Sequence, residues 1–141
     1  PTDAQVSYFL GHFVKLVRGV PTDGVVLREN WLEAYRFLTP QAAQRLNEVA
    51  REEDPFSLLG TTARSAIVTS IVQRSAETWQ VSWIEATHGA NGGARSAFTG
   101  LFTIRFERPR SSDALARNPL GLFITEFSFS PEAPAASPRG G

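Results

Sequence analysis

The sequence lacks cysteine and methionine, has a single lysine, Lys15, and carries no net charge. The absence of cysteine excludes disulfides and thiolate metal sites within this chain. Lys+Arg and Asp+Glu are equal at 14 each, so the basic excess typical of nucleic-acid-binding domains is missing. We therefore expect no direct contact with nucleic acid.

Long hydrophobic runs are also missing, since no apolar stretch reaches the ~20 residues that a helix needs to cross a bilayer. The chain begins at Pro1 and not at a methionine. We expect it to be a fragment or a processed chain, with any membrane anchor or signal lying upstream. With 141 residues and a hydrophobic fraction of 42%, it is large and apolar enough to bury a core as one domain.

The first third of the chain has helical periodicity. Apolar residues near the N-terminus recur at spacings of three and four and form one stripe, while Tyr8 and His12 fall outside it. Gly and Pro residues punctuate the helical segments. We expect three helices, over residues 3–18, 23–38 and 40–52.

The hydrophobic period then changes to two, which predicts strands with one buried and one wetter face. A tight link near 75–77 suits a hairpin, whereas the glycine-rich segment 88–96 predicts a longer link with a mobile tip. One helical turn is expected near 113–117. The Pro/Ala-rich tail, 131–141, should be disordered. The predicted strands cover residues 65–74, 78–87, 97–108 and 122–130.

Helices followed by consecutive strands predict an α+β fold for residues 1–130, which we treat as a single domain. The aromatic-rich face of the sheet needs a cover, and the amphipathic helices supply one. We therefore expect a strongly curved, four-stranded antiparallel sheet packed against the N-terminal helices.

Patterns that would indicate catalysis are sparse. His12 and His88 lack metal-ligand spacing and are interpreted as surface residues. Glu85 and Glu126 lie in predicted strands, where a buried carboxylate beside Tyr35 would suit a general base. Solvent exposure or pairing with arginine is the simpler interpretation of both. We expect no catalytic residue, no cofactor and no metal ion.

The three tryptophans, Trp31, Trp79 and Trp83, are interpreted as core residues, because core packing is the usual fate of tryptophan at such spacing. They would also suit the lining of a pocket between sheet and helices. A small-molecule-binding or enzymatic domain that uses this cavity is the alternative function.

A tight turn is predicted before the last strand by the sequence "NPLG". Asn118, Pro119 and Gly121 occupy the first, second and fourth positions, which these residue types favour in a type I turn. The side chain of Asn118 is expected to bond the backbone near Leu120. The turn forms a rigid corner with Leu120 at its tip.

The order of these motifs resembles the TrbF family of conjugal-transfer proteins, which are VirB8-like inner-membrane subunits of bacterial type IV secretion systems. The resemblance extends from about Val6 to Ser130. It is carried by Asn30-Trp31-Leu32 with Ala34-Tyr35, Leu46-Asn47-Glu48 with Ala50-Arg51, Asp54-Pro55-Phe56 and Asn118-Pro119-Leu120-Gly121.

The resemblance implies a nuclear-transport-factor-two-like (cystatin-like) domain on the periplasmic face of the inner membrane. A single transmembrane helix, missing here, would precede it and provide the only membrane contact. Members are assembly factors and not known enzymes. The implied partners are a second copy, most simply as a dimer, and other channel subunits.

The family's Asn-Pro-x-Gly motif maps onto Asn118, Pro119 and Gly121, and it is associated with positioning the last strand and with subunit contacts. We add Tyr8 and Leu120 as expected exposed contact residues. One departure is the ending "EFSFS", where many relatives carry a tryptophan. This difference concerns the partner surface and not the family.

Overall fold

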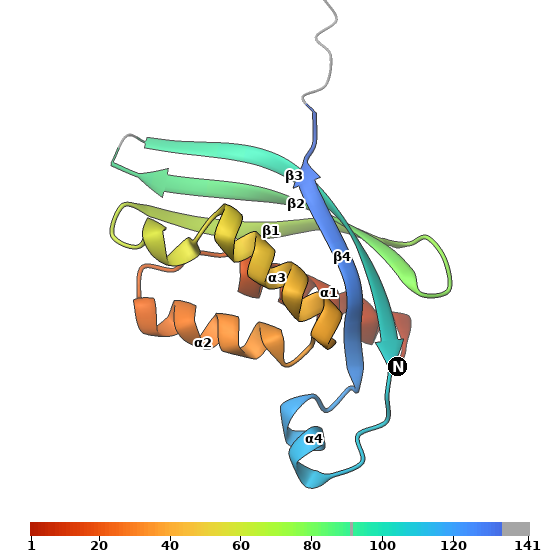
Figure 1. The fold of residues 1–141 in the computed structure, drawn as a ribbon. Helices are drawn as coiled ribbons and strands as arrows, with labels where there is room; N and C mark the ends of the chain where they lie inside the picture. Colours follow the sequence, from red (N-terminus) through yellow and green to blue (C-terminus); the bar gives the residue numbers. More distant parts are fainter. Residues whose placement is uncertain (91, 134–141) are drawn as a thin grey trace, which may run out of the picture.

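The computed structural model describes residues 1–90 and 92–133, so most of the predicted disordered tail lies outside the described residues. N-terminal helices precede a four-stranded sheet, and a short helix precedes the last strand (Figure 1). The predicted α+β fold with a four-stranded antiparallel sheet is confirmed. The elements are α1 (Asp3–Arg18), α2 (Gly24–Tyr35), α3 (Pro40–Glu52), the 3-10 helix η1 (Pro55–Leu58), β1 (Thr62–Gln73), β2 (Thr78–Gly89), β3 (Gly92–Phe106), α4 (Ser112–Arg117) and β4 (Leu122–Pro131).

Helix α2 is shorter than predicted, because the chain leaves it to reach the edge of the sheet. The helix ends at Tyr35, and Leu38 forms an isolated parallel bridge with Ile124 of β4. The Ile124 N–H donates to the Phe37 carbonyl at 2.8 Å, and the Thr39 N–H donates to the Ile124 carbonyl at 3.1 Å. These tertiary hydrogen bonds override the helical spacing that extended the prediction to residue 38.

The predicted long link over residues 88–96 is also wrong. Strand β2 continues to Gly89, and β3 begins opposite it at Gly92, so most of this segment is paired. Gly92 has a φ of +96°, a conformation that glycine adopts without steric cost. The sheet therefore extends further toward this hairpin. The other strand ends differ from the prediction by at most three residues.

The sheet has the order β1-β2-β3-β4 with antiparallel neighbours, and two bulges interrupt its register. The extra residues are Thr69 in β1 and Thr125 in β4. The Thr69 hydroxyl donates to the Ser82 carbonyl at 3.1 Å, and the Thr125 hydroxyl donates to the Thr103 carbonyl at 3.2 Å. Bulges increase local twist and bending, which accounts for the way the strands curve around the helices in Figure 1.

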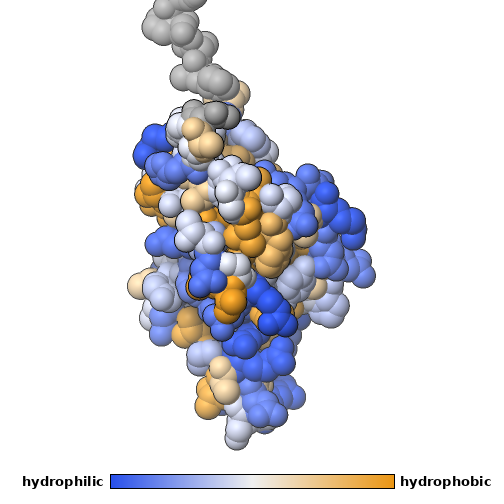
Figure 2. All heavy atoms as spheres, turned by 90° about the vertical axis from the view of Figure 1, so that its left-hand side faces the viewer, coloured by the Kyte–Doolittle hydropathy of each residue, from blue (hydrophilic) through white to orange (hydrophobic). Residues whose placement is uncertain are grey.

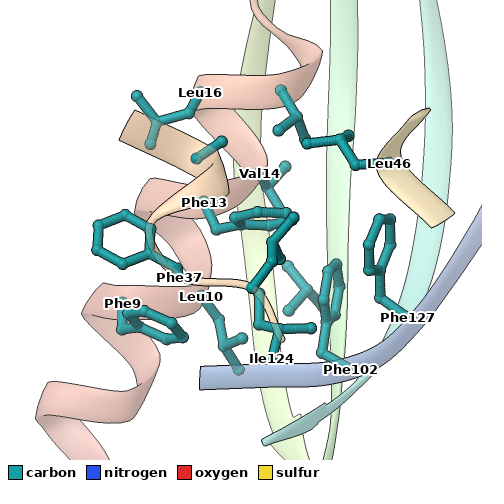
Figure 3. Packing of buried hydrophobic residues seen from close by; sticks show 14 of the residues in the cluster. Phe9, Leu10, Phe13, Val14, Leu16, Phe37, Leu46, Phe102, Ile124 and Phe127 are labelled. Atoms are coloured by element: carbon teal, nitrogen blue, oxygen red, sulfur yellow. The ribbon is translucent and has the colours of Figure 1, made fainter. Parts of the chain in front are cut away.

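The core lies between the curved sheet and the helices, with α1 in the concavity. Phe13 of α1 meets Phe102 and Phe127 of the sheet edge-to-face, at ring-centroid distances of 6.1 Å and 5.6 Å (Figure 3). The aromatic and aliphatic side chains interdigitate there, as buried cores require. All three tryptophans are buried in this core, as predicted: Trp31, Trp79 and Trp83.

Each outer strand of the sheet is bridged at one point by a residue from a link between two helices. Val20, which follows α1, forms an antiparallel bridge with Arg64 of β1. Leu38, which follows α2, bridges Ile124 of β4 on the opposite edge. Each bridge satisfies edge groups that would otherwise be open to a foreign strand. The helices are thereby fastened to both sides of the sheet.

A buried ionic cluster fastens the C-terminal end of α1 to the sheet. Glu85 accepts two hydrogen bonds from the Arg18 guanidinium, at 2.6 Å and 2.9 Å, and one from the Trp83 indole N–H at 2.9 Å. Arg64 donates to the Arg18 carbonyl and to a Glu53 carboxylate oxygen, both at 2.7 Å. Three elements and the α3–η1 link therefore meet in one network.

Aromatic rings complete the surroundings of Arg18. Its guanidinium carbon lies 5.3 Å from the Phe98 ring centroid and 4.9 Å from that of Phe129, within the range of cation–π attraction. Glu85 and Glu126 therefore follow the simpler interpretation of the strand carboxylates. Glu85 is buried and paired with arginine, and Glu126 is exposed to solvent.

Replacing Glu85 by glutamine tests how much this cluster contributes to stability. Removing one partner of a buried ion pair costs about 3–5 kcal/mol, because the remaining charges lose their compensation. We expect a loss of this size in the free energy of unfolding of Glu85→Gln, measured by urea denaturation. Glu126→Gln changes the same group at an exposed position and should stay within about 0.5 kcal/mol of wild type. Equal stabilities for the two variants would contradict this role.

Candidate functional site

The Asn-Pro-Leu-Gly turn forms the corner between α4 and β4. The Gly121 N–H donates to the Asn118 carbonyl at 3.0 Å, which closes the four-residue turn. Leu120 has a negative φ, as a type I turn requires and a type II turn does not. The predicted turn is therefore present. It connects the end of α4 directly to the first residue of the last strand.

The Asn118 side chain is buried and spans the turn. Its Nδ2 donates to the Leu122 carbonyl at 2.7 Å, and not to backbone near Leu120 as expected. The difference follows from the helix before the turn. The Asn118 N–H ends α4 by donating to the Ala114 carbonyl at 2.9 Å, so this residue also caps the helix. Asn118 consequently joins α4, the turn and β4.

Gly121 is required at the corner for two reasons. Its φ is +66°, in the left-handed region that side chains disfavour. Its carbonyl accepts from the Glu107 N–H at 2.8 Å. This hydrogen bond holds the backbone of Glu107, the first residue after β3, close to the turn. A Cβ at this position would lie 2.2 Å from the Glu107 carbonyl oxygen. No side chain fits there without displacing backbone.

The corner borders a groove of about 310 Å³, which we call the corner groove. The N-terminal half of α1 and the end of α2 form its other walls. Two predicted contact sites far apart in the sequence, Tyr8 and the turn, therefore meet at one surface. The lining residues are Tyr8, Phe9, His12, Glu33, Arg36, Phe37, Ala116, Arg117, Asn118, Pro119 and Leu120.

The corner groove combines an apolar floor with a polar pair. The Tyr8 side chain is 73% exposed and stacks on His12 with ring centroids 5.9 Å apart. His12 Nε2 lies 2.7 Å from a Glu33 carboxylate oxygen, which links α1 to α2. Leu120 is half-buried against the core and not exposed as expected, and the buried Phe37 also lines the groove.

On its other side the corner borders a larger cleft of about 740 Å³, which we call the arginine cleft. The chain segment between β3 and α4 forms one wall, and the end of α2 forms the other. The two hollows share Arg36, Arg117 and Asn118. The lining residues are Tyr35, Arg36, Leu38, Phe106, Glu107, Arg108, Pro109, Arg110, Ala114, Arg117, Asn118, Gly121 and Phe123.

Tyr35, which lines the arginine cleft, is neutral. Burial raises the pKa of the Tyr35 phenol above its usual range, and the positive charge of Arg51 offsets part of that rise. The hydroxyl donates to the Asn47 side chain and so links α2 to α3. Since the phenol stays protonated at neutral pH, it adds no negative charge to the cleft.

The structure does not assemble the residues considered for catalysis. Tyr35 is bonded to Asn47, Glu85 is bonded to Arg18, and Glu126 lies exposed on β4. Within residues 1–90 and 92–133, no group of three or more His, Asp or Glu side chains is placed to hold a metal ion. Buried side chains fill the centre of the space between sheet and helices, and the alternative function is not favoured.

Sequence reasoning did not single out the basic residues that matter most. Arg18 lies on the buried stripe of α1, and the helical spacing from Val14 would have signalled its burial. Arg36 and Arg117 meet beside the corner although they lie far apart in the sequence. No local sequence pattern predicts that these two arginines line the same groove, because this depends on how α2 and α4 pack.

Comparison with known proteins places this arrangement in a family. The family model described as VirB8 protein matches residues 1–132. The chain belongs to the VirB8 family. This confirms the resemblance seen in the sequence, since that family comprises the VirB8-like components of type IV secretion systems, which are structural subunits and not known enzymes.

Individual VirB8-family relatives agree with this assignment. The conjugal transfer protein TrbF of Rhizobium radiobacter is 29% identical over 124 residues, which cover 85% of this chain and 56% of that protein. The present chain thus spans about half the length of that relative. Within the described residues no helix is both long and apolar enough to cross a membrane.

Solved structures of the VirB8 family have the same fold. The VirB8 protein of Agrobacterium tumefaciens matches with a TM-score of 0.82 at 14% identity, over 95% of each chain. The TrwG component of a type IV secretion system from Bartonella birtlesii matches with a TM-score of 0.79 at 19% identity, over 94% of each chain. The nuclear-transport-factor-two-like fold is therefore confirmed.

Alanine substitution at Gly121 separates steric overlap from backbone strain when it is compared with Gly60. Both glycines have a positive φ, which costs a side chain about 1–2 kcal/mol. Only Gly121 faces an overlap, since a Cβ at Gly60 meets nothing within 4 Å. We expect Gly121→Ala to lose clearly more unfolding free energy than Gly60→Ala in urea denaturation. Similar losses would show that the close approach to Glu107 is easily relieved.

Proposed function

We propose that this chain is the periplasmic domain of an inner-membrane-anchored subunit of a conjugation or type IV secretion channel. In this proposal it acts in plasmid DNA transfer by self-association, most simply as a dimer, and by contact with other channel subunits. Membership of the VirB8 family and similarity to a conjugal transfer protein support the proposal. A segment outside this chain would supply the membrane anchor.

The observation that carries the self-association proposal is the meeting of Tyr8 with the Asn118 corner in one groove. Helix α1 presents an aromatic ring that is 73% exposed, and the corner presents Leu120 and Pro119 beside it. Aromatic residues near an apolar centre, surrounded by polar groups, are characteristic of protein interfaces. His12 and Glu33 provide such polar groups beside Tyr8.

A two-fold symmetric contact is the simplest form of this proposal. In an isologous dimer the same patch is used twice, so Tyr8 of one copy can enter the corner groove of the other and receive its Tyr8 in return. Each partner in a standard interface buries roughly 800 Å², so residues around the corner groove must also contribute. The exposed face of α1 next to Tyr8 would supply the remaining area.

Replacing Tyr8 by arginine should weaken self-association. A buried aromatic anchor commonly contributes 2 kcal/mol or more, so we expect the dimer dissociation constant of Tyr8→Arg to rise by at least about tenfold. Sedimentation velocity over a concentration series measures this change. Thermal unfolding should remain close to that of wild type, because the Tyr8 side chain is largely solvent-exposed.

Val25→Arg is the matched control for this substitution. Val25 is 66% exposed on α2, lies outside the corner groove and gains the same charge. Its dimerisation should equal that of wild type. If both variants dimerise like wild type, or both lose dimerisation equally, the groove is not the self-association surface.

The role in transfer is tested in donor cells that lack the full-length gene. Complementation with wild type should restore conjugative transfer, Tyr8→Arg expressed at the same level should not, and Val25→Arg should restore it. Transfer frequency is the measurement. If deletion leaves the frequency unchanged, the proposed channel role is wrong. If Tyr8→Arg restores transfer fully, self-association through the groove is not needed for it.

A further inference from the structure

The arginine cleft concentrates positive charge on a chain whose net charge is zero. Four exposed arginines line it, Arg36, Arg108, Arg110 and Arg117, against one acidic residue, Glu107. Glu107 is already paired, since its carboxylate lies 2.7 Å from the guanidinium of Arg105. The residues that line the cleft therefore carry a net positive charge.

None of the four guanidinium groups forms an ion pair anywhere in the part of the chain that the structure describes. This contrasts with Arg18 and Arg64, which have carboxylate partners in the buried cluster. Like charges gathered around one cleft repel each other, which an anionic occupant would relieve. Arginine is well suited to this role because its planar group binds carboxylates through two hydrogen bonds.

Apolar groups lie between these arginines. Phe106 is 50% exposed at the end of β3, and Phe123 and Leu38 form part of the cleft wall. The volume of about 740 Å³ lies within the roughly 300–1,000 Å³ of typical ligand sites, so an apolar side chain fits beside a carboxylate. Figure 2 shows the lower end of the molecule, where α4 lies, as largely hydrophilic with separate hydrophobic residues among the polar ones.

We propose that the arginine cleft binds an acidic peptide segment of a partner protein, in which carboxylate side chains alternate with apolar ones. The carboxylates contact the arginines and an apolar side chain packs on Phe106. This surface is distinct from the corner groove, since Arg108 and Arg110 line only the cleft. A nucleic acid is the less suitable occupant, because a chain without net positive charge lacks the broad attraction that phosphate backbones require.

The test uses a fluorescein-labelled peptide of alternating Glu and Phe, titrated with the protein and followed by fluorescence anisotropy. We expect binding that weakens as salt rises, because the contacts are ionic and partly exposed. The same peptide with Gln in place of Glu should bind at least tenfold more weakly. The double variant Arg108→Glu, Arg110→Glu should lower affinity for the Glu peptide by at least tenfold.

Arg95→Glu serves as the control for position, since it makes one such charge reversal, half the charge change of the double variant, on the exposed β2–β3 hairpin, away from the cleft. It should change affinity by less than twofold. The double variant should also dimerise like wild type, and Tyr8→Arg should still bind the peptide. These two results separate a failure of this inference from a failure of the proposed self-association.

Three results would overturn the inference. The first is equal binding of the Glu and Gln peptides to wild type, a comparison that does not depend on any variant folding. The second is an equal loss in Arg95→Glu and in the double variant, which would indicate a non-specific charge effect. The third is tighter binding of a labelled single-stranded oligonucleotide that also depends on Arg108 and Arg110, which would make the occupant a nucleic acid.

Discussion

The position of α1 depends on the buried carboxylate of Glu85. Taking charges out of water costs several kcal/mol per ion, and only well-placed partners compensate for that cost. Glu85 obtains them from Arg18 at the end of α1 and from Trp83 on its own strand. A shift of α1 along the sheet would leave these charges buried without partners. Because α1 is one continuous helix, the same constraint places Tyr8, in its N-terminal half, beside the corner.

The corner is held by contacts that are independent of the ionic cluster. Asn118 caps α4 and bonds the Leu122 carbonyl, while Gly121 passes close to the backbone of Glu107. These contacts fix how α4 leaves the sheet and so separate the corner groove from the arginine cleft. One short turn thereby shapes two surfaces of different chemistry. The first is mainly aromatic and apolar, and the second is cationic.

Features set by neighbouring residues were predictable from the sequence. Both α1 and α3 match their expected bounds, since their ends carry strong capping signals such as Thr2 and Pro40. The type I turn was read from its residue types alone. Features set by packing were not predictable. Leu38 lies outside α2 and bridges β4, and the Asn118 side chain donates to the Leu122 carbonyl. The grooves escaped prediction for the same reason, because their walls come from separate elements.

Arg36 and Arg117 belong to both hollows, and this gives the two proposed binding events a common thermodynamic term. A peptide bound in the arginine cleft would neutralise Arg36 and Arg117, which a second copy in the corner groove would also contact. Under these proposals the free energy of dimerisation therefore depends on whether the peptide is bound. Such linkage is reciprocal: the factor by which a peptide changes dimer affinity equals the factor by which dimerisation changes peptide affinity. Under these proposals, oligomeric state and partner engagement form a single coupled equilibrium, and the concentration of either component would regulate the other.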